Sequence, residues 1–293
     1  MRKLFFIPIL LGLFISCNDG DIIVTEFNFE LDNLDSCGGP GGYVFFNINN
    51  SNAAESISLI LKTNDILFLD SGTEEYVLDG NSNIVNYRKY SGDVSSDYFC
   101  SNIPPTSPGV TIEYLGESGI AELTTFATKD DEDGKEEDLT SDLNTDGDSL
   151  LNYFDDDDDG DNVPTVVELG SDFLEGINEN PLDTDNDGIF DYLDDDDDGD
   201  GVLTRYEDAN GDLDPTNDIT DSAVGPNYLN PIVTDSNVID QYRVHSFKLV
   251  SDISLLVKNL ILVNGEEQIT QETMIFGNKS DVINTTLSLT PDF

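Results

Sequence analysis

The sequence predicts a mainly β protein in which a β-sandwich-like domain is interrupted by an irregular acidic repeat segment. Three observations predict this arrangement. Short runs near both ends of the chain alternate between apolar and polar residues, as strands with one buried face do. Turn-forming Gly, Pro, Asn and Asp residues separate these runs. In the middle of the chain, 38 of the 61 acidic residues fall between Asp130 and Asp240, where only Lys135 and Arg205 oppose them.

The first 16 residues are expected to be a lipoprotein signal peptide. Arg2 and Lys3 form a basic start, and an apolar run from Leu4 to Ile15 follows them. This run is shorter than the roughly 20 residues that span a bilayer. The closing Ser-Cys pair resembles a bacterial lipobox, although Phe14 stands where Leu is usual. We therefore expect Cys17 to be lipidated; the alternative is a plain secretory peptide in which Cys17 has no role.

Residues 17–128 are expected to form the N-terminal part of the β domain. Apolar residues alternate with polar ones over 27–31 and, less cleanly, over 57–62, and Tyr43 to Ile48 is rich in aromatic and β-branched residues. Cys37 and Cys100 remain as a pair once Cys17 is assigned to the anchor. An exported protein is expected to oxidise such a pair to a disulfide, and two reduced, buried thiols are the alternative.

The acidic segment, residues 129–240, contains the same pattern twice. A dodecamer at 144–155 recurs at 183–194, and each copy is followed, one residue later, by a second acidic dodecamer, at 157–168 and 196–207. Oxygen ligands at positions 1, 3 and 5, a turn residue at 6 and a carboxylate at 12 suit a hard cation. The expected calcium ligands are Asn144, Asp146, Asp148, Asn152, Asp155, Asp157, Asp159, Asp161, Glu168, Asp183, Asp185, Asp187, Asp191, Asp194, Asp196, Asp198, Asp200 and Glu207.

The four loops are expected to differ in affinity. Position 6 must turn sharply, which favours Gly188 and Gly201, is tolerated by Asn162 and suits Ser149 poorly. We therefore rank the loops that begin at residues 183 and 196 first, the loop at 157 next and the loop at 144 last. At position 9 of the last loop, Thr204 is expected to act through water.

A solvated, disordered acidic linker is the alternative to a calcium module. Two observations argue against it: apolar residues recur at position 8, and Tyr153 and Tyr192 recur at position 10. We expect the segment to be disordered without calcium and ordered by it. The short spacing leaves no room for the helices that flank an EF-hand, and the pattern over 144–207 resembles the thrombospondin type-3 repeats of bacterial lipoproteins. Dockerins share the loop but need a following helix.

Residues 241–293 are expected to complete the sandwich. Tyr242 to Val250, Ser254 to Val263 and Glu272 to Phe276 are predicted strands, and Asn264-Gly265 predicts a hairpin. A piece of about 50 residues would be marginal by itself. We therefore expect these strands to pair with the N-terminal ones, with the acidic segment inserted in the connection.

The sequence predicts a binding or structural protein and not an enzyme. It contains no nucleophile, zinc-protease, phosphate-loop or dinucleotide motif, and its single histidine, His245, is expected to be packed or on the surface. A formal charge of -49 excludes nucleic acid as a partner. We expect a calcium-binding, lipid-anchored, surface-exposed outer-membrane protein with a structural or adhesive role. The alternative is a lipoprotein that binds a glycan or peptide, with the calcium module as scaffold.

Overall fold

The protein is mainly β, as the sequence predicts. The computed structural model describes the whole chain except residues 1–21, 24–26, 28 and 137, so the expected signal peptide and the lipidated Cys17 lie outside the described residues. Strands hold 38% of the residues and helices 10%, which confirms the predicted fold class. The strands are β1 (Ile22–Ile23), β2 (Leu34–Gly39), β3 (Gly42–Asn49), β4 (Glu55–Leu61), β5 (Gly72–Val77), β6 (Ile84–Tyr90), β7 (Val110–Asp130), β8 (His245–Asn264) and β9 (Glu267–Leu289).

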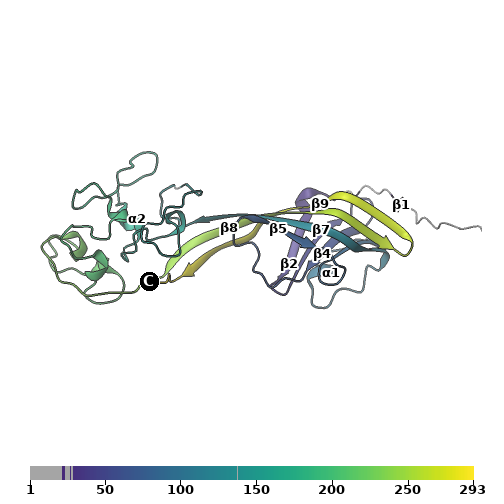
Figure 1. Ribbon diagram of the computed structural model, residues 1–293, viewed down its shortest axis with the longest axis horizontal. Coiled ribbons are helices and arrows are strands. Elements are labelled where there is room, and N and C mark those ends of the chain that lie inside the picture. Colours follow the sequence, from purple (N-terminus) through teal and green to yellow (C-terminus); the bar gives the residue numbers. More distant parts are fainter. Residues whose placement is uncertain (1–21, 24–26, 28, 137) are drawn as a thin grey trace, which may run out of the picture. The chain divides into compact units, whose positions relative to one another are not determined.

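The strands expected in a sandwich-like domain form one continuous sheet, which is nearly closed on itself. Its order is β1-β9-β8-β7-β6-β4-β3-β2, and β5 also pairs with β7 (Figure 1). The pairs from β2 to β7 are antiparallel, and β1 runs parallel to β9. Because β7 and β8 are neighbours, the acidic segment between them is an insertion in the connection of two adjacent strands.

The helices are short. They are α1 (Asp97–Cys100), α2 (Thr165–Glu168) and six 3-10 turns, η1 (Leu31–Asn33), η2 (Asn152–Phe154), η3 (Asp191–Leu193), η4 (Thr204–Tyr206), η5 (Pro215–Asn217) and η6 (Asn227–Leu229). Within the described part of the chain, no helix is long and apolar enough to cross a bilayer.

One predicted strand is not formed by the described residues. Of the strand expected over 27–31, the described residues Phe27, Phe29 and Glu30 lie outside strands, and Leu31 begins η1. The Phe27 ring instead packs edge-on against Tyr87, with 4.8 Å between ring centroids. The alternation of apolar and polar residues over 27–31 therefore predicted a strand that the described residues do not form.

The C-terminal strands are longer than predicted. β8 runs through the polar residues Ser251 and Asp252, where we expected an interruption, because both have partners: Ser251 Oγ donates to the Phe68 carbonyl, and Asp252 Oδ1 accepts from the Asp281 amide. The hairpin turn consists of Gly265 and Glu266, one residue later than the predicted Asn264-Gly265, and Gly265 takes the positive φ of 61°.

The chain divides into two compact units, whose boundaries fall inside β5, β7, β8 and β9 and between residues 64 and 65. Unit 1 comprises residues 1–64, 75–122 and 255–277, and unit 2 comprises residues 65–74, 123–254 and 278–293. The acidic segment therefore belongs to a unit that also includes strand ends. The boundaries predicted from sequence, at 128/129 and 240/241, placed these strand ends in the β domain instead.

Unit 1 has an apolar core and a disulfide. Ile57, Leu59 and Leu61 of β4 are all fully buried, and the serines between them and before them, Ser58 and Ser56, are buried too, which explains why the alternation there is weak. Cys37 and Cys100 form a disulfide, which confirms the predicted pair. The tight β2–β3 hairpin requires glycine at residue 38, where φ is +91° and a Cβ would lie 2.2 Å from the Gly42 carbonyl oxygen.

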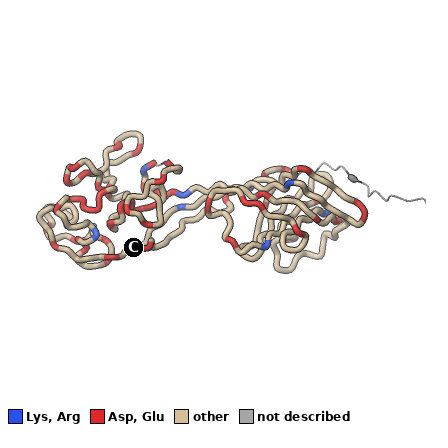
Figure 2. Tube along the Cα trace, viewed as in Figure 1, with Lys and Arg blue, Asp and Glu red and all other residues tan. Residues whose placement is uncertain are grey.

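Unit 2 has a smaller apolar core, which fixes the first acidic repeat to the start of β8. Leu150 and Phe154 from the repeat pack with Phe247 and Leu249 from the strand. The Phe154 and Phe247 rings meet edge to face, with centroids 5.2 Å apart. Acidic residues are distributed along the whole insertion (Figure 2). These apolar contacts therefore anchor the first repeat of the irregular chain to β8.

Candidate metal centres

The four acidic dodecamers share one backbone frame. We name them loop A (144–155), loop B (157–168), loop C (183–194) and loop D (196–207). In every loop, the side chain at position 9 accepts a hydrogen bond from the amide of position 2. The pairs are Asn152 with Thr145, Thr165 with Asp158, Asp191 with Thr184 and Thr204 with Asp197, at 3.0, 3.1, 2.7 and 3.2 Å.

The frame gives position 9 a structural role. Asn152 and Asp191, which we expected to bind calcium, close their loops, and Asp191 lies outside the carboxylate groups described below. Thr204, which we expected to act through water, does the same. Asn, Thr and Asp each offer one acceptor oxygen at this distance from the backbone. This shared acceptor explains why position 9 can be Asn, Thr or Asp in different loops.

Two positions of the frame turn with positive φ. Position 4 does so in all four loops, at Gly147, Gly160, Asn186 and Gly199. Position 6 does so at Asn162, Gly188 and Gly201, with φ values of 76, 97 and 93°. Ser149, at position 6 of loop A, is not among the left-handed residues, which agrees with the poor suitability expected of serine there.

The most enclosed carboxylates gather around loop B. Asp159, Asp161 and Glu168 come from positions 3, 5 and 12 of this loop, and Asp197 joins them from loop D. We call these four residues the central cluster. One carboxylate oxygen from each lies within 4.8 Å of the others, and the four residues are 4, 0, 1 and 2% exposed.

The charge of the central cluster is poorly compensated. Both carboxylate oxygens of Asp159, Glu168 and Asp197 are buried without a hydrogen-bond partner among the described residues. Burial, and after it the neighbouring carboxylates, raises the pKa of all four acids far above the ordinary range. Uncompensated buried charges are costly. The cluster therefore needs either protons or a cation.

Asp157, the expected first ligand of loop B, lies outside the central cluster. Its Oδ1 accepts from the Asp161 amide at 3.2 Å, and its Oδ2 accepts from the Asn162 amide at 3.1 Å. Arg243 Nε donates to the same Oδ2 at 3.1 Å. Asp197 takes its place in the cluster. Sequence reasoning missed Asp197 because position 2 is not a ligand position within its own loop.

Loop D forms a second, partly buried group. Asp196, Asp198 and Asp200, at positions 1, 3 and 5, bring one oxygen each within 4.8 Å of the others. Glu207 at position 12 is 2% exposed, and neither of its carboxylate oxygens has a hydrogen-bond partner among the described residues. Burial, followed by the charges of the three aspartates, raises the pKa of Glu207 to about 8. All four predicted side-chain ligands of loop D therefore interact.

Loop C is more open. Asp183, Asp185 and Asp187 gather in the same way, but Asp185 and Asp187 are exposed. Asp194 at position 12 is not in this group, and its Oδ1 accepts from the Asp196 amide at 3.2 Å. Glycine at position 6 led us to rank loop C above loop B, yet the carboxylates are more enclosed in loop B.

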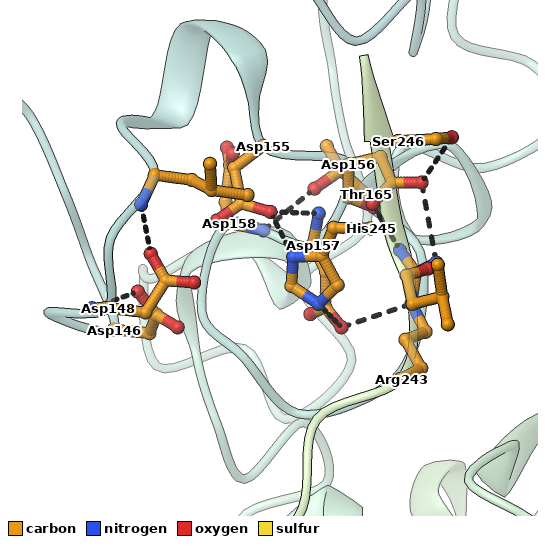
Figure 3. Close-up of polar contacts among 12 residues, drawn as sticks. Asp146, Asp148, Asp155, Asp156, Asp157, Asp158, Thr165, Arg243, His245 and Ser246 are labelled. Carbon is orange, nitrogen blue, oxygen red and sulfur yellow. Dashed lines mark hydrogen bonds and ion pairs between the residues drawn. The ribbon is translucent and has the colours of Figure 1, made fainter. Parts of the chain in front are cut away.

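Loop A brings a histidine to its carboxylates. Asp148, Asp155 and His245 have possible ligand atoms within 4.8 Å of one another, and Figure 3 shows the His245 ring between Asp155 and Asp157. The His245 Nδ1 lies 2.6 Å from Asp155 Oδ1, and its Nε2 lies 3.6 Å from Asp157 Oδ2. His245 is fully buried. The sequence predicted a packed or surface histidine but gave no sign of its acidic neighbours.

The other expected oxygen ligands of loop A face its own chain. Asn144 Oδ1 accepts from the Gly147 amide at 2.6 Å, and its Nδ2 donates to the Asp148 carbonyl at 3.1 Å. Asp146 Oδ1 accepts from the Asp148 amide at 3.0 Å. The group of Asp148, Asp155 and His245 does not include Asp146, although Asp146 Oδ2 is buried without a hydrogen-bond partner among the described residues.

A third, incomplete repeat follows loop D. Asn227 Oδ1 accepts from the Thr220 amide at 2.8 Å, as position 9 does in the four loops. Asp208, Asp212 and Asp218 gather just before it. The signal in the sequence is the triplet Asn227-Tyr228-Leu229, which parallels Asn152-Tyr153-Phe154 and Asp191-Tyr192-Leu193. The four dodecamers expected from the sequence end at Glu207, before this repeat begins.

Comparison with known proteins finds no relative of this chain. No protein-family model, no curated protein and no solved structure matches the chain significantly. The geometry itself provides several groups of carboxylates, most of them with oxygen donors alone. Such groups could hold metal ions.

Proposed function

We propose that this chain is a calcium-binding, lipid-anchored protein of the outer membrane and cell surface, in which calcium orders the acidic segment. The central cluster is the observation that most supports calcium binding. Its donors are carboxylate oxygens, which hard cations prefer. Calcium accepts protein oxygens in flexible numbers and geometries, whereas magnesium gives up its water reluctantly. Enclosed, unpaired carboxylates therefore suit calcium better than magnesium.

The helices around the loops support the resemblance to thrombospondin type-3 repeats. The 3-10 turns η2, η3 and η4 are three residues each, and α2 is four residues. EF-hands and dockerins require longer helices beside the same kind of loop. A chain that wraps around ions, with few apolar contacts, fits these short turns better.

A structural or adhesive role accounts for the repeats better than ligand binding by an aromatic surface does. An exposed tyrosine or phenylalanine platform would favour the glycan- or peptide-binding alternative. All 11 tyrosines lie in the described part of the chain, and none of them is exposed. Among the described phenylalanines, Phe126 on β7, Phe190 in loop C and Phe293 are exposed, and they come from three separate segments of the chain. We therefore propose that calcium stiffens the segment and so spaces or displays the β domain.

The anchor is proposed from Cys17 alone, which lies outside the described residues. Several acyl chains hold a protein firmly at a membrane, whereas one holds it only marginally. We expect the processed protein in the outer-membrane fraction. A Cys17→Ala variant that still accumulates there as a processed, detergent-phase protein contradicts the proposed anchor.

Calcium titration of the soluble protein, from residue 18 onward, tests the metal. After treatment with a chelator, calorimetry and circular dichroism should show heat and compaction in the range of about 10⁻⁴ to 10⁻³ M typical of extracellular calcium modules. Magnesium at the same concentration is the control. No heat and no change of shape at ~5 mM calcium, well above that range, would disprove calcium binding.

A cell-surface and glycan binding screen tests the role. The same soluble protein is compared with and without calcium, and Glu207→Gln is compared with wild type. Adhesion that depends on calcium supports the structural or adhesive role. Calcium-independent binding of one defined glycan or peptide would favour the alternative instead.

A further inference from the structure

Loop A differs from the three other loops in its donors. Asn144 is bonded within its own loop, and Ser149 does not take the left-handed conformation found at position 6 elsewhere. Loop A brings two of its own carboxylates together, Asp148 and Asp155, whereas loop D brings together three.

An imidazole replaces the missing oxygens. His245, at the start of β8, comes from outside the repeats and reaches Asp148 and Asp155. It is fully buried, and its Nε2 has no hydrogen-bond partner among the described residues. Asp148 Oδ2 is also buried without such a partner. Both atoms therefore lack a hydrogen bond, and the Nε2 lies 3.6 Å from Asp157 Oδ2.

Imidazole changes the class of metal that the site suits. Calcium and magnesium take oxygen ligands, whereas imidazole suits zinc, copper, iron and nickel. Zinc is commonly bound by three protein ligands with a fourth position open to water. Asp148, Asp155 and His245 supply three ligands of the types that zinc accepts, and Asp148 is only partly buried, which leaves a side open to solvent.

We propose that Asp148, Asp155 and His245 form a site for a divalent transition metal of the zinc class, separate from the calcium sites of loops B, C and D. A metal bound here would take the place of the hydrogen bond between His245 and Asp155, because both side chains would coordinate the ion instead. The site lies between the first repeat and the start of β8, so a metal there would cross-link these two segments of unit 2.

The competing reading is an internal ion pair. A protonated His245 could be held between Asp155 and Asp157 with no metal, because its two ring nitrogens lie 2.6 and 3.6 Å from their oxygens. The metal site and the ion pair differ in the protonation state of the His245 ring, which can be measured. A bound metal removes a proton from a ring nitrogen and coordinates it, whereas the ion pair keeps both nitrogens protonated.

The chain contains a single histidine, so its imidazole can be followed without ambiguity. The full processed chain, without a histidine tag and saturated with calcium to fill the oxygen sites, is titrated with Zn²⁺. We expect one equivalent to bind and one ring nitrogen of His245 to shift in the ¹⁵N spectrum. Zinc that binds without changing the imidazole signals, or signals of a doubly protonated ring throughout, overturns the proposal.

Matched variants separate this site from nonspecific binding to acids. Asp148→Asn and Asp187→Asn change the same position, 5, in loops A and C. Asp148→Asn and His245→Gln should each lower zinc affinity at least about tenfold, since even the loss of a residue that supports a ligand costs about 10- to 100-fold. Asp187→Asn should leave it unchanged. An equal loss in Asp187→Asn overturns the proposal.

Calcium binding is measured in the same samples. Retained calcium binding in His245→Gln shows that the variant is folded and that a loss of zinc is local. Calcium binding by the wild type without zinc binding refutes the site of loop A alone. Zinc binding without calcium binding refutes the proposed function alone.

Discussion

Asp197→Asn should stabilise the metal-free protein. Burial, and after it the charges of Asp161 and other carboxylates, raises the pKa of Asp197 to about 11 from an ordinary 3.8. At pH 7 the folded, metal-free protein therefore holds a proton on this group that the unfolded chain does not. Each pH unit between 3.8 and 7 costs about 1.4 kcal/mol, which gives an upper bound of about 4 kcal/mol. This bound requires that the folded pKa of Asp197 lies above 7, and it does not depend on how far above 7 it lies.

The dependence on pH has a definite sign. Between 3.8 and about 11 the folded state binds more protons than the unfolded state at Asp197, so this group lowers stability as pH rises through that window. Asparagine does not titrate. The stability gain of Asp197→Asn in the metal-free protein should therefore be small near pH 4 and grow towards pH 7. With calcium bound, the same substitution removes a ligand and should destabilise.

Urea unfolding of unit 2, followed by near-ultraviolet circular dichroism at pH 4.5 and 7 with chelator or calcium, measures these effects. The pH values are about half a unit above the ordinary aspartate pKa and well above it. Asp235→Asn is the matched control, because Asp235 is an exposed residue in the same acidic segment and the charge change is the same. If metal-free Asp197→Asn is no more stable than Asp235→Asn at pH 7, the reasoning about the central cluster is wrong.

Three further predictions concern single contacts. Arg243→Ala should destabilise unit 2 by about 3 to 5 kcal/mol in urea unfolding, because it leaves the buried Asp157 without its partner; Arg88→Ala, which breaks a more exposed pair, should cost about 1 kcal/mol or less. Removal of the Cys37–Cys100 disulfide, which closes a separation of 63 residues, should destabilise unit 1 by about 4 kcal/mol in thermal unfolding. Glu207→Gln should weaken calcium binding in calorimetry, because it removes a charge and a ligand oxygen from loop D, and should leave unit 1 as stable as before.

Each of these predictions can fail in a definite way. Equal effects of Arg243→Ala and Arg88→Ala would mean that Asp157 is solvated or paired elsewhere. A disulfide-free variant with unchanged melting would mean that the unfolded chain gains little freedom from reduction. Unchanged calcium binding in Glu207→Gln would mean that the loop register is wrong.

Sequence reasoning succeeded where neighbouring residues determine the result. β3 and β4 follow from runs of apolar and β-branched residues, and the spacing of aspartates in loop D brings Asp196, Asp198 and Asp200 together. Such features depend on local backbone geometry, which a short pattern encodes. The Cys37–Cys100 pair followed from counting, because only two cysteines remained.

The sequence could not predict contacts that form only after distant segments meet. Asp197 occupies a non-ligand position of its own loop, and it enters the central cluster because loops B and D pack together. His245 is separated from Asp155 by 90 residues. The role of position 9 could have been suspected, since Asn, Thr and Asp have little in common there except an acceptor oxygen.

Arg243 and His245, at the start of β8, contact carboxylates in the first half of the acidic segment. Arg243 lies 3.0 Å from Asp156 and 3.1 Å from Asp157, and His245 contacts Asp155. These contacts, together with the packing of Phe154 on Phe247, hold loops A and B to the start of β8. The central cluster of loop B, however, has unpaired carboxylates, and one of its members comes from loop D. A cation at this cluster would therefore fix the second half of the segment to the first, because Asp197 of loop D would bind the same ion as the carboxylates of loop B.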